Sequence, residues 1–274
     1  MSKNIDLIKY KLLKLPIRLK VVIEKGEGTP VILLHGIGKN NKVWGNVISE
    51  LTGKGGFRIM AIDLLGFGDS PKPDWLEYSI EDHTSAVINT LEKLKLNHKA
   101  IVVGHSMGCL IAVRAAKLRP DLIKHLVLYE MPIFEGLPSN KLAKLRLAAF
   151  TGYYKWVSNY EPRFDKKNLG YAYRLAQKTY GFSVDQETWH PFINSLKNTI
   201  LKQSISKDLK NLKIPIDVIY GSYDMLVING HTKKTFGSNK DEVRHHKVRA
   251  RHIISKKASK FIARRVIAAE TTPN

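Results

Sequence analysis

The stretch "AIVVGHSMGC" at residues 100–109 places a serine between two glycines, directly after an apolar run. The pattern is Gly-x-Ser-x-Gly, in which Gly104 and Gly108 flank Ser106. Glycine is unfavourable inside a strand or helix because it loses more conformational freedom on folding than any other residue. Two glycines around one serine therefore predict a sharp backbone turn, at which larger side chains would collide.

The residues on either side of this turn give it a structural setting. "AIVVGH" at 100–105 is typical of a buried strand, and "CLIAVRAAKLRP" at 109–120 predicts a helix that ends at a proline. A strained turn between strand and helix lifts a serine hydroxyl clear of the sheet, and the helix N-terminus stabilises negative charge nearby. The pattern alone also occurs by chance, but in this setting it predicts that Ser106 is a nucleophile.

Short apolar runs recur along the whole chain, with segments of helical spacing between them. Strands are predicted in seven segments, at 17–26, 31–36, 57–63, 100–105, 125–130, 214–224 and 242–248. Helices are predicted at 79–96, with Ser79 as N-cap, at 109–120 and at 254–270. Short apolar runs suit strands that are buried on both faces, and their alternation with helices indicates an α/β protein with a parallel sheet.

One region breaks this alternation. Residues 131–206 have a helical sequence pattern that is rich in aromatic residues, and they contain no convincing strand. This region is predicted to form a helical cap between the two parts of a core domain, at 1–130 and 207–274. Aromatic side chains of this region are candidates to line an apolar substrate pocket, although packing within the cap is the simpler role for most of them. They are Tyr153, Tyr154, Trp156, Phe182 and Trp189.

The charge of the chain is strongly basic, with 45 Lys and Arg against 24 Asp and Glu and a formal net charge of +21. Such a charge attracts acidic partners. The lysines are dispersed, however, and no nucleic-acid-binding motif appears, so a solvated lysine-rich surface is expected and no specific nucleic acid partner. The basic start at residues 1–20 is interpreted as a docked N-terminal segment, with weak association with an acidic membrane surface as the alternative.

The lengths of the apolar runs and the cysteine content indicate where in the cell the protein is located. No stretch approaches 18 uninterrupted apolar residues, so no transmembrane helix is expected. Cys109 is the only cysteine, which excludes an internal disulfide. With no recognisable export signal, these features lead us to expect a cytoplasmic protein. The sequence gives no indication of oligomeric state.

A nucleophilic serine needs a base and a carboxylate that holds the base. Of the ten histidines, His252 is the best candidate because it lies on the loop between the last predicted strand and the last helix. Asp224 ends a predicted strand and is the preferred acid, with Glu130 at the end of 125–130 as the alternative. Backbone N–H groups of Met107 and Ile37 are the candidates for stabilising an oxyanion.

Five motifs then occur in a characteristic order. They are "VILLHGIGKNNKVW", "AIDLLGFGDSPKP", "VVGHSMGCLIA", "YGSYD" and "ARHI". With them the chain resembles the α/β-hydrolase superfamily, specifically its capped esterase, lipase and carbon–carbon bond hydrolase branch. The resemblance implies a mostly parallel, twisted eight-stranded sheet flanked by helices, with a helical cap insert. It also implies that Asp63 belongs to a structural turn. The chain departs from the pattern at the histidine turn, which reads Ala-Arg-His where many relatives have a glycine before the histidine.

The same resemblance implies the site residues and the chemistry. Ser106, Asp224 and His252 would form the catalytic triad, with Ile37 and Met107 as the oxyanion hole. We expect a serine hydrolase that cleaves a carboxylic ester of a small or medium apolar substrate through an acyl-enzyme, with no metal or organic cofactor. A carbon–carbon bond hydrolase, a perhydrolase and a non-catalytic ligand receptor that retains the triad stay open as alternatives.

Overall fold

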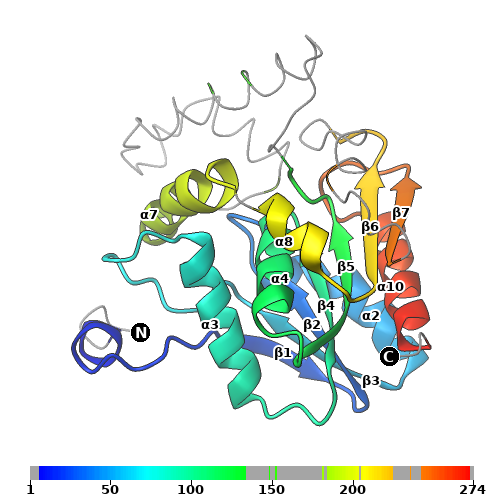
Figure 1. Cartoon of the computed structure of the whole chain (residues 1–274), viewed down its shortest axis with the longest axis horizontal. Helices are drawn as coiled ribbons and strands as arrows, with labels where there is room; N and C mark the ends of the chain where they lie inside the picture. Colours follow the sequence, from blue (N-terminus) through cyan, green and yellow to red (C-terminus); the bar gives the residue numbers. More distant parts are fainter. Residues whose placement is uncertain are drawn as a thin grey trace.

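A single sheet organises the part of the chain that the computed structural model describes, residues 6–133, 148, 152, 181, 184–203, 205–224, 235 and 242–271. Seven strands of this part follow the order β1-β3-β2-β4-β5-β6-β7 (Figure 1). They are β1 (Val21–Lys25), β2 (Thr29–Leu34), β3 (Phe57–Ile62), β4 (Ala100–His105), β5 (Ile123–Tyr129), β6 (Ile216–Gly221) and β7 (Val243–Val248). β1 pairs antiparallel with β3, and all the other pairs are parallel.

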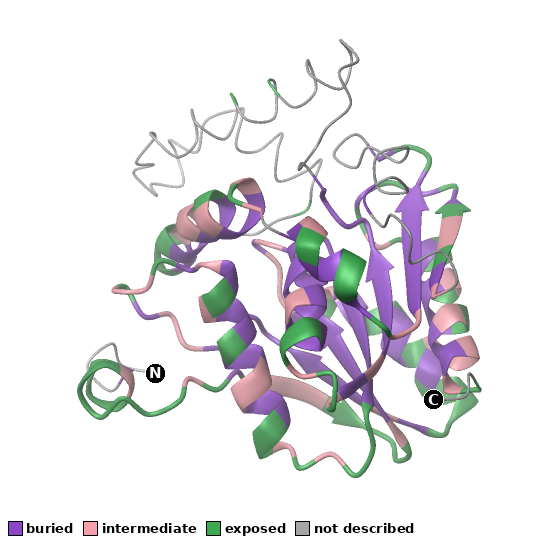
Figure 2. Ribbon diagram, in the orientation of Figure 1, coloured by how far each residue is buried: buried purple, intermediate pink, exposed green. Residues whose placement is uncertain are grey.

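Helices cover both faces of the sheet, as its apolar strands require. Ile32 and Val102 point to a core beneath α3 (Ile80–Lys93), α4 (Met107–Leu118) and α8 (Ile205–Asn211). Val31 and Val103 point to the opposite core beneath α2 (Gly45–Lys54) and α10 (Lys256–Glu270). Figure 2 shows the central strands as continuously buried, which explains why they have no polar alternation.

Capping side chains set the start of two of the predicted helices. Ser79 accepts a hydrogen bond from the backbone N of Asp82, whose carboxylate in turn accepts from the backbone N of Ser79, so α3 begins in a capping box. Ser255 caps α10 by accepting a hydrogen bond from Ala258 N at 3.2 Å. The expected N-cap Ser79 is confirmed.

The mostly parallel sheet flanked by helices is confirmed. The resemblance implied eight strands, of which the described residues hold seven, and these overlap the seven segments that the sequence indicated. No helix within the described residues combines the length and the apolar character that crossing a bilayer requires.

The expected cap is described only in part. Of residues 131–206, the helix α7 (Gln186–Ser195) and the helical segment η3 (Leu196–Leu201) are described and are helical. Trp189 stacks on Phe192, with 6.1 Å between ring centres, and packs against the core, which is a packing role. The division into core and cap stays a prediction. The other aromatic candidates lie outside the described residues: Tyr153, Tyr154, Trp156 and Phe182.

Candidate active site

The turn at Ser106 has the strained geometry that its glycines predict. Ser106 adopts φ 51° and ψ −119°, a conformation that costs a non-glycine residue about 1–3 kcal/mol. A Cβ on Gly104 would lie 2.7 Å from the Cys109 backbone, and one on Gly108 would lie 2.3 Å from the carbonyl oxygen of Leu34. The two glycines are therefore required because α4 starts in direct contact with the strands beside it.

The three predicted triad residues meet at the carboxyl end of the sheet. The Nε2 atom of His252 lies 3.0 Å from Ser106 Oγ, and its Nδ1 atom lies 2.7 Å from Asp224 Oδ2. All three residues are buried, with 6–9% of their surface exposed. If Nδ1 carries the proton and donates it to Asp224, Nε2 is left as an acceptor for the serine proton. This arrangement can move a proton from an alcohol to an imidazole.

The loop after β2 comes close to the serine at the position proposed for the oxyanion hole. A Cβ on Gly36 would lie only 3.0 Å from the Ser106 Cβ, so the backbone that leads into Ile37 passes beside the serine. Met107, the first residue of α4, is fully buried and places its backbone at the positive end of the helix dipole. Both backbone segments therefore lie beside Ser106.

Glu130, the alternative acid, lies behind the triad. Its side chain is fully buried, and Oε1 accepts a hydrogen bond from Gly221 N at 2.6 Å. Ligand atoms of Glu130, Asp224 and His252 lie within 4.8 Å of one another, the only group of three metal-ligating side chains among the described residues. Asp224 Oδ2 is hydrogen-bonded to His252 Nδ1 at 2.7 Å. Asp224, rather than Glu130, is therefore the carboxylate that contacts the imidazole.

Burial and the neighbouring Asp224 raise the pKa of Glu130 to about 11. Two buried carboxyl groups this close cannot both be ionised without a large cost, so one of them holds its proton at neutral pH. Glu130 is the neutral one, because Asp224 has the imidazole as its partner.

Two aromatic residues that the sequence analysis did not assign hold the loop that carries His252. His105 Nε2 donates to the backbone oxygen of His252 at 2.9 Å, and Tyr129 Oη donates to the backbone oxygen of Arg251 at 2.8 Å. Burial, together with the nearby His252, lowers the pKa of His105, which keeps its ring neutral. The sequence places both residues at strand ends, but the long-range contact to residues 251 and 252 leaves no local signal.

Two other histidines, His35 and His83, have structural partners. His35 Nε2 accepts from Leu64 N at 2.9 Å, and His83 Nε2 lies 2.9 Å from Ser195 Oγ. Asp63 accepts hydrogen bonds from the backbone N of Asn41 at 2.7 Å and of Asp69 at 2.9 Å, so it orders the turn after β3. The role of Asp63 agrees with the structural turn that the resemblance implied.

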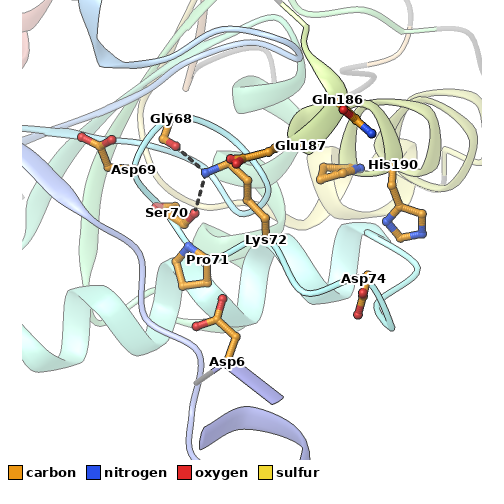
Figure 3. Close-up of a pocket in the computed structure, with 11 residues that line it drawn as sticks. Asp6, Gly68, Asp69, Ser70, Pro71, Lys72, Asp74, Gln186, Glu187 and His190 are labelled. Atoms are coloured by element: carbon orange, nitrogen blue, oxygen red, sulfur yellow. Dashed lines mark hydrogen bonds between the residues drawn. The ribbon is translucent and has the colours of Figure 1, made fainter. Parts of the chain in front are cut away.

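A cavity of about 440 Å³ lies apart from these residues, between the loop 68–74, the start of α7 and Asp6 (Figure 3). None of the residues that line it belongs to the predicted triad. Lys72 Nζ donates to the backbone oxygens of Gly68 at 2.6 Å and Ser70 at 3.4 Å, which orders its rim. Its carboxylates are not among the side chains of the described residues that could jointly hold a metal ion.

Comparisons with known proteins place this geometry in a family. A sequence model described as alpha/beta hydrolase fold matches residues 29–254. The chain is 37% identical over 121 residues to a probable lysophospholipase, BODYGUARD 4 of Arabidopsis thaliana, which covers 43% of the chain and 29% of that relative. It is 29% identical over 229 residues to the karrikin insensitive 2 receptor CA of Petunia hybrida, covering 75% of the chain and 77% of the receptor.

A solved structure agrees on the fold. An esterase from Exiguobacterium antarcticum superposes with a TM-score of 0.68 at 19% identity, covering 91% of the chain and 94% of the esterase. The chain matches less than two thirds of the length of the Arabidopsis relative, so that protein's activity is not transferred from the alignment.

Proposed function

The chain belongs to the alpha/beta hydrolase fold family, and from that premise we propose that it is a serine hydrolase acting on carboxylic esters. The observation that carries the proposal is the unbroken hydrogen-bond relay from Ser106 through His252 to Asp224, at 3.0 Å and 2.7 Å. The substrate class is a small or medium ester with an apolar acyl or alcohol part.

The first half-reaction transfers the acyl group to the serine. Ser106 Oγ attacks the ester carbonyl carbon while His252 Nε2 takes the hydroxyl proton. Asp224 holds the imidazole in the tautomer with the proton on Nδ1 and stabilises the imidazolium that forms. The C–O bond then breaks, and the imidazolium gives its proton to the departing alkoxide, so that an alcohol leaves and an acyl-enzyme remains.

The second half-reaction uses the same groups with water. His252 takes a proton from a water molecule that attacks the acyl carbon, and the proton returns to Ser106 as the carboxylic acid is released. In both steps the backbone N–H groups of Ile37 and Met107 would donate to the oxyanion, each contributing about 3 kcal/mol to transition-state stabilisation. The proposed reaction needs no cofactor. The cytoplasmic location of the protein stays a prediction.

Esters of graded acyl length test the proposal. We expect turnover of p-nitrophenyl esters and stoichiometric labelling by a fluorophosphonate, both lost in Ser106→Ala and His252→Ala variants with native circular dichroism. The matched control is His98→Ala, which changes a histidine that has no part in the relay. Retained turnover in His252→Ala would transfer the role of base to another residue, and an unlabelled wild-type protein would remove the serine hydrolase proposal.

A ligand receptor that retains the triad is the second candidate, because the petunia relative that aligns over most of the chain is a receptor by name. A receptor that keeps the triad but does not deacylate would also be labelled by the fluorophosphonate. It would release only about one equivalent of p-nitrophenol, because the acyl group stays on Ser106. Multiple-turnover kinetics on the ester series separates the two, since an enzyme continues at constant rate long after one equivalent of product.

A further inference from the structure

Glu130 is fully buried behind the triad and is used by none of the steps above. Its backbone has φ 54°, an unusual conformation for a non-glycine residue, and its N–H donates to the carbonyl oxygen of Ile219 at 2.9 Å. Side-chain Oε1 accepts from Gly221 N at 2.6 Å. A Cβ on Gly221 would lie 2.5 Å from this oxygen, so the backbone of β6 is shaped around the Glu130 carboxyl group.

The surroundings of the second carboxyl oxygen of Glu130 indicate whether this side chain is ionised or protonated. Oε2 is buried and receives no hydrogen bond from any described residue. An ionised carboxylate would leave this oxygen unsatisfied, whereas a carboxylic acid has a proton there to donate. The acceptor is Asp224, which has a carboxylate oxygen within 4.8 Å of a Glu130 oxygen, and a hydrogen bond between the two carboxyl groups is among the causes that raise the pKa of Glu130.

We propose that Glu130 is a positioning residue that, in its neutral form, donates a hydrogen bond to Asp224 and fixes that carboxylate against His252. The inference rests on the proposed function, since it assigns Asp224 and His252 as acid and base. A donor on Asp224 withdraws part of its negative charge from the imidazole. Removing this donor would strengthen the attraction of Asp224 for an imidazolium and so favour the protonated form of the ring.

Other titratable groups face the pair without titrating in the same range. Burial lowers the pKa of His105 and raises the pKa values of Tyr129 and Cys109, so these three stay neutral in acid and at neutral pH. Burial lowers the pKa of Lys39 to about 8, which lies at the basic end of a rate profile. The acid limb of the profile of kcat against pH therefore reports the protonation of the Ser106–His252–Asp224 relay.

The test compares Glu130→Leu, which removes the donor, with Glu130→Gln, which keeps both a donor and an acceptor in the same shape. In Glu130→Leu we expect the pH at which His252 takes up its proton, followed by NMR of the imidazole, to rise by about half a unit or more. The acid limb of kcat should move with it while KM stays unchanged, and Glu130→Gln should match the wild type. Equal changes in both variants, or no change in either, would overturn the proposal.

An infrared measurement keeps the proposal testable if Glu130→Leu does not fold. The difference spectrum between the wild type and Glu130→Gln at pH 7 should contain the C=O band of a protonated carboxylic acid. Carboxylate bands in its place would refute a neutral Glu130. Neither this spectrum nor the NMR titration requires turnover. An inactive protein would therefore refute the proposed function, while the two spectroscopic measurements would still decide the role of Glu130.

A different observation concerns the N-terminal segment, whose apolar side chains point to solvent. Eight large hydrophobic residues of the described part are exposed, and five of them fall within nine consecutive positions. These five, which we call the N-terminal surface, are Leu7 at 39%, Ile8 at 50%, Leu12 at 67%, Leu13 at 61% and Leu15 at 48% exposed. Figure 2 shows this segment as mostly exposed and set apart from the sheet.

The charges beside the N-terminal surface are of one sign. Exposed lysines alternate with the apolar residues at Lys9, Lys11 and Lys14, and residues 7–20 contain no Asp or Glu. Lys11 Nζ lies 5.8 Å from the ring centre of Trp75, which connects the segment to the core domain. Exposed apolar side chains flanked by cations match an interface with acyl chains beneath and anionic headgroups above.

We infer that the N-terminal surface docks on bilayers that contain anionic phospholipid. Vesicles of phosphatidylcholine with about a quarter phosphatidylglycerol should co-sediment the protein, and pure phosphatidylcholine should do so far less. Leu12→Ser/Leu13→Ser and Lys9→Glu/Lys11→Glu should each reduce the bound fraction several-fold. The control is Leu118→Ser, which changes a leucine that is 55% exposed on α4 and should bind as the wild type does.

Two outcomes would overturn this inference. Binding unchanged in the leucine pair would mean that these side chains do not enter the bilayer, and a dimer of the wild type that Leu12→Ser/Leu13→Ser dissociates would mean that a second copy covers them. Hydrolysis of soluble esters should be unchanged in every one of these variants, which separates this inference from the proposed function.

Discussion

Replacing Gly108 by alanine tests why a glycine must follow the serine. Gly108 lies in the first turn of α4, where alanine alone would stabilise the helix by at most about 1 kcal/mol. Against this gain, the new Cβ would lie 2.3 Å from the backbone oxygen of Leu34 and 2.6 Å from that of His35. Both contacts are with backbone atoms, which cannot rotate away as a flexible side chain can.

The magnitude follows from how far α4 must move. Relieving a contact of 2.3 Å requires a displacement of about 1 Å, and such overpacking costs about 1–3 kcal/mol, or more where backbone is involved. We expect Gly108→Ala to lose about 2 kcal/mol of unfolding free energy in urea denaturation. Because Ser106 directly precedes the same helix, its Oγ shifts relative to His252, and ester turnover should fall by about 100-fold.

The matched control is Gly53→Ala, in the exposed last turn of α2, where an added Cβ meets nothing within 4 Å. This variant should be as stable as the wild type or gain up to about 1 kcal/mol, with unchanged turnover. A Gly108→Ala variant that behaves like Gly53→Ala in both measurements would refute the close-approach explanation of the Gly-x-Ser-x-Gly turn.

Three further predictions concern stability and the relay. Asp217 is fully buried, accepts hydrogen bonds from two histidines and forms an ion pair with Arg265. Asp217→Asn should therefore lower the unfolding free energy, measured by urea denaturation, by about 3 kcal/mol. The control Asp121→Asn, at an exposed ion pair, should change the unfolding free energy by less than about 1 kcal/mol. Burial lowers the pKa of His35 to about 4 and that of His83 to about 3, below the value of about 6.5 in the unfolded chain. The unfolded chain therefore binds more protons between these values, and the unfolding free energy should fall by about 2 kcal/mol per pH unit as the pH drops from about 6 to 4.5; a flat urea midpoint over this range would contradict it. Tyr129→Phe removes the bond to the loop of His252 and should reduce kcat by about fivefold without changing the fold seen by circular dichroism, while an unchanged kcat would show that His105 alone suffices.

The sequence was most informative where the fold imposes local patterns. The apolar runs located all seven described strands because a parallel sheet buries both faces of each strand, and Ser79 located the start of α3 because capping is a contact between residues three apart. Ser106 was also predictable, since its turn needs a specific order of residues. The neutral state of Glu130 and the contact of His105 with the loop of His252 were not predictable, because both depend on residues more than 90 positions away.

The active-site end of the sheet is held together by backbone hydrogen bonds that step from strand to strand. Ser106 N donates to Tyr129 O beyond β4, Glu130 N donates to Ile219 O beyond β5, and Ser222 N donates to Val248 O beyond β6. The first two of these donors are residues with positive φ, so the strain at each turn is offset by a bond to the neighbouring strand. Loosening any one strand end therefore releases the next turn as well. The catalytic geometry and the local stability of this sheet edge should consequently be lost together, before the rest of the sheet unfolds, which hydrogen exchange at these three amides measures directly.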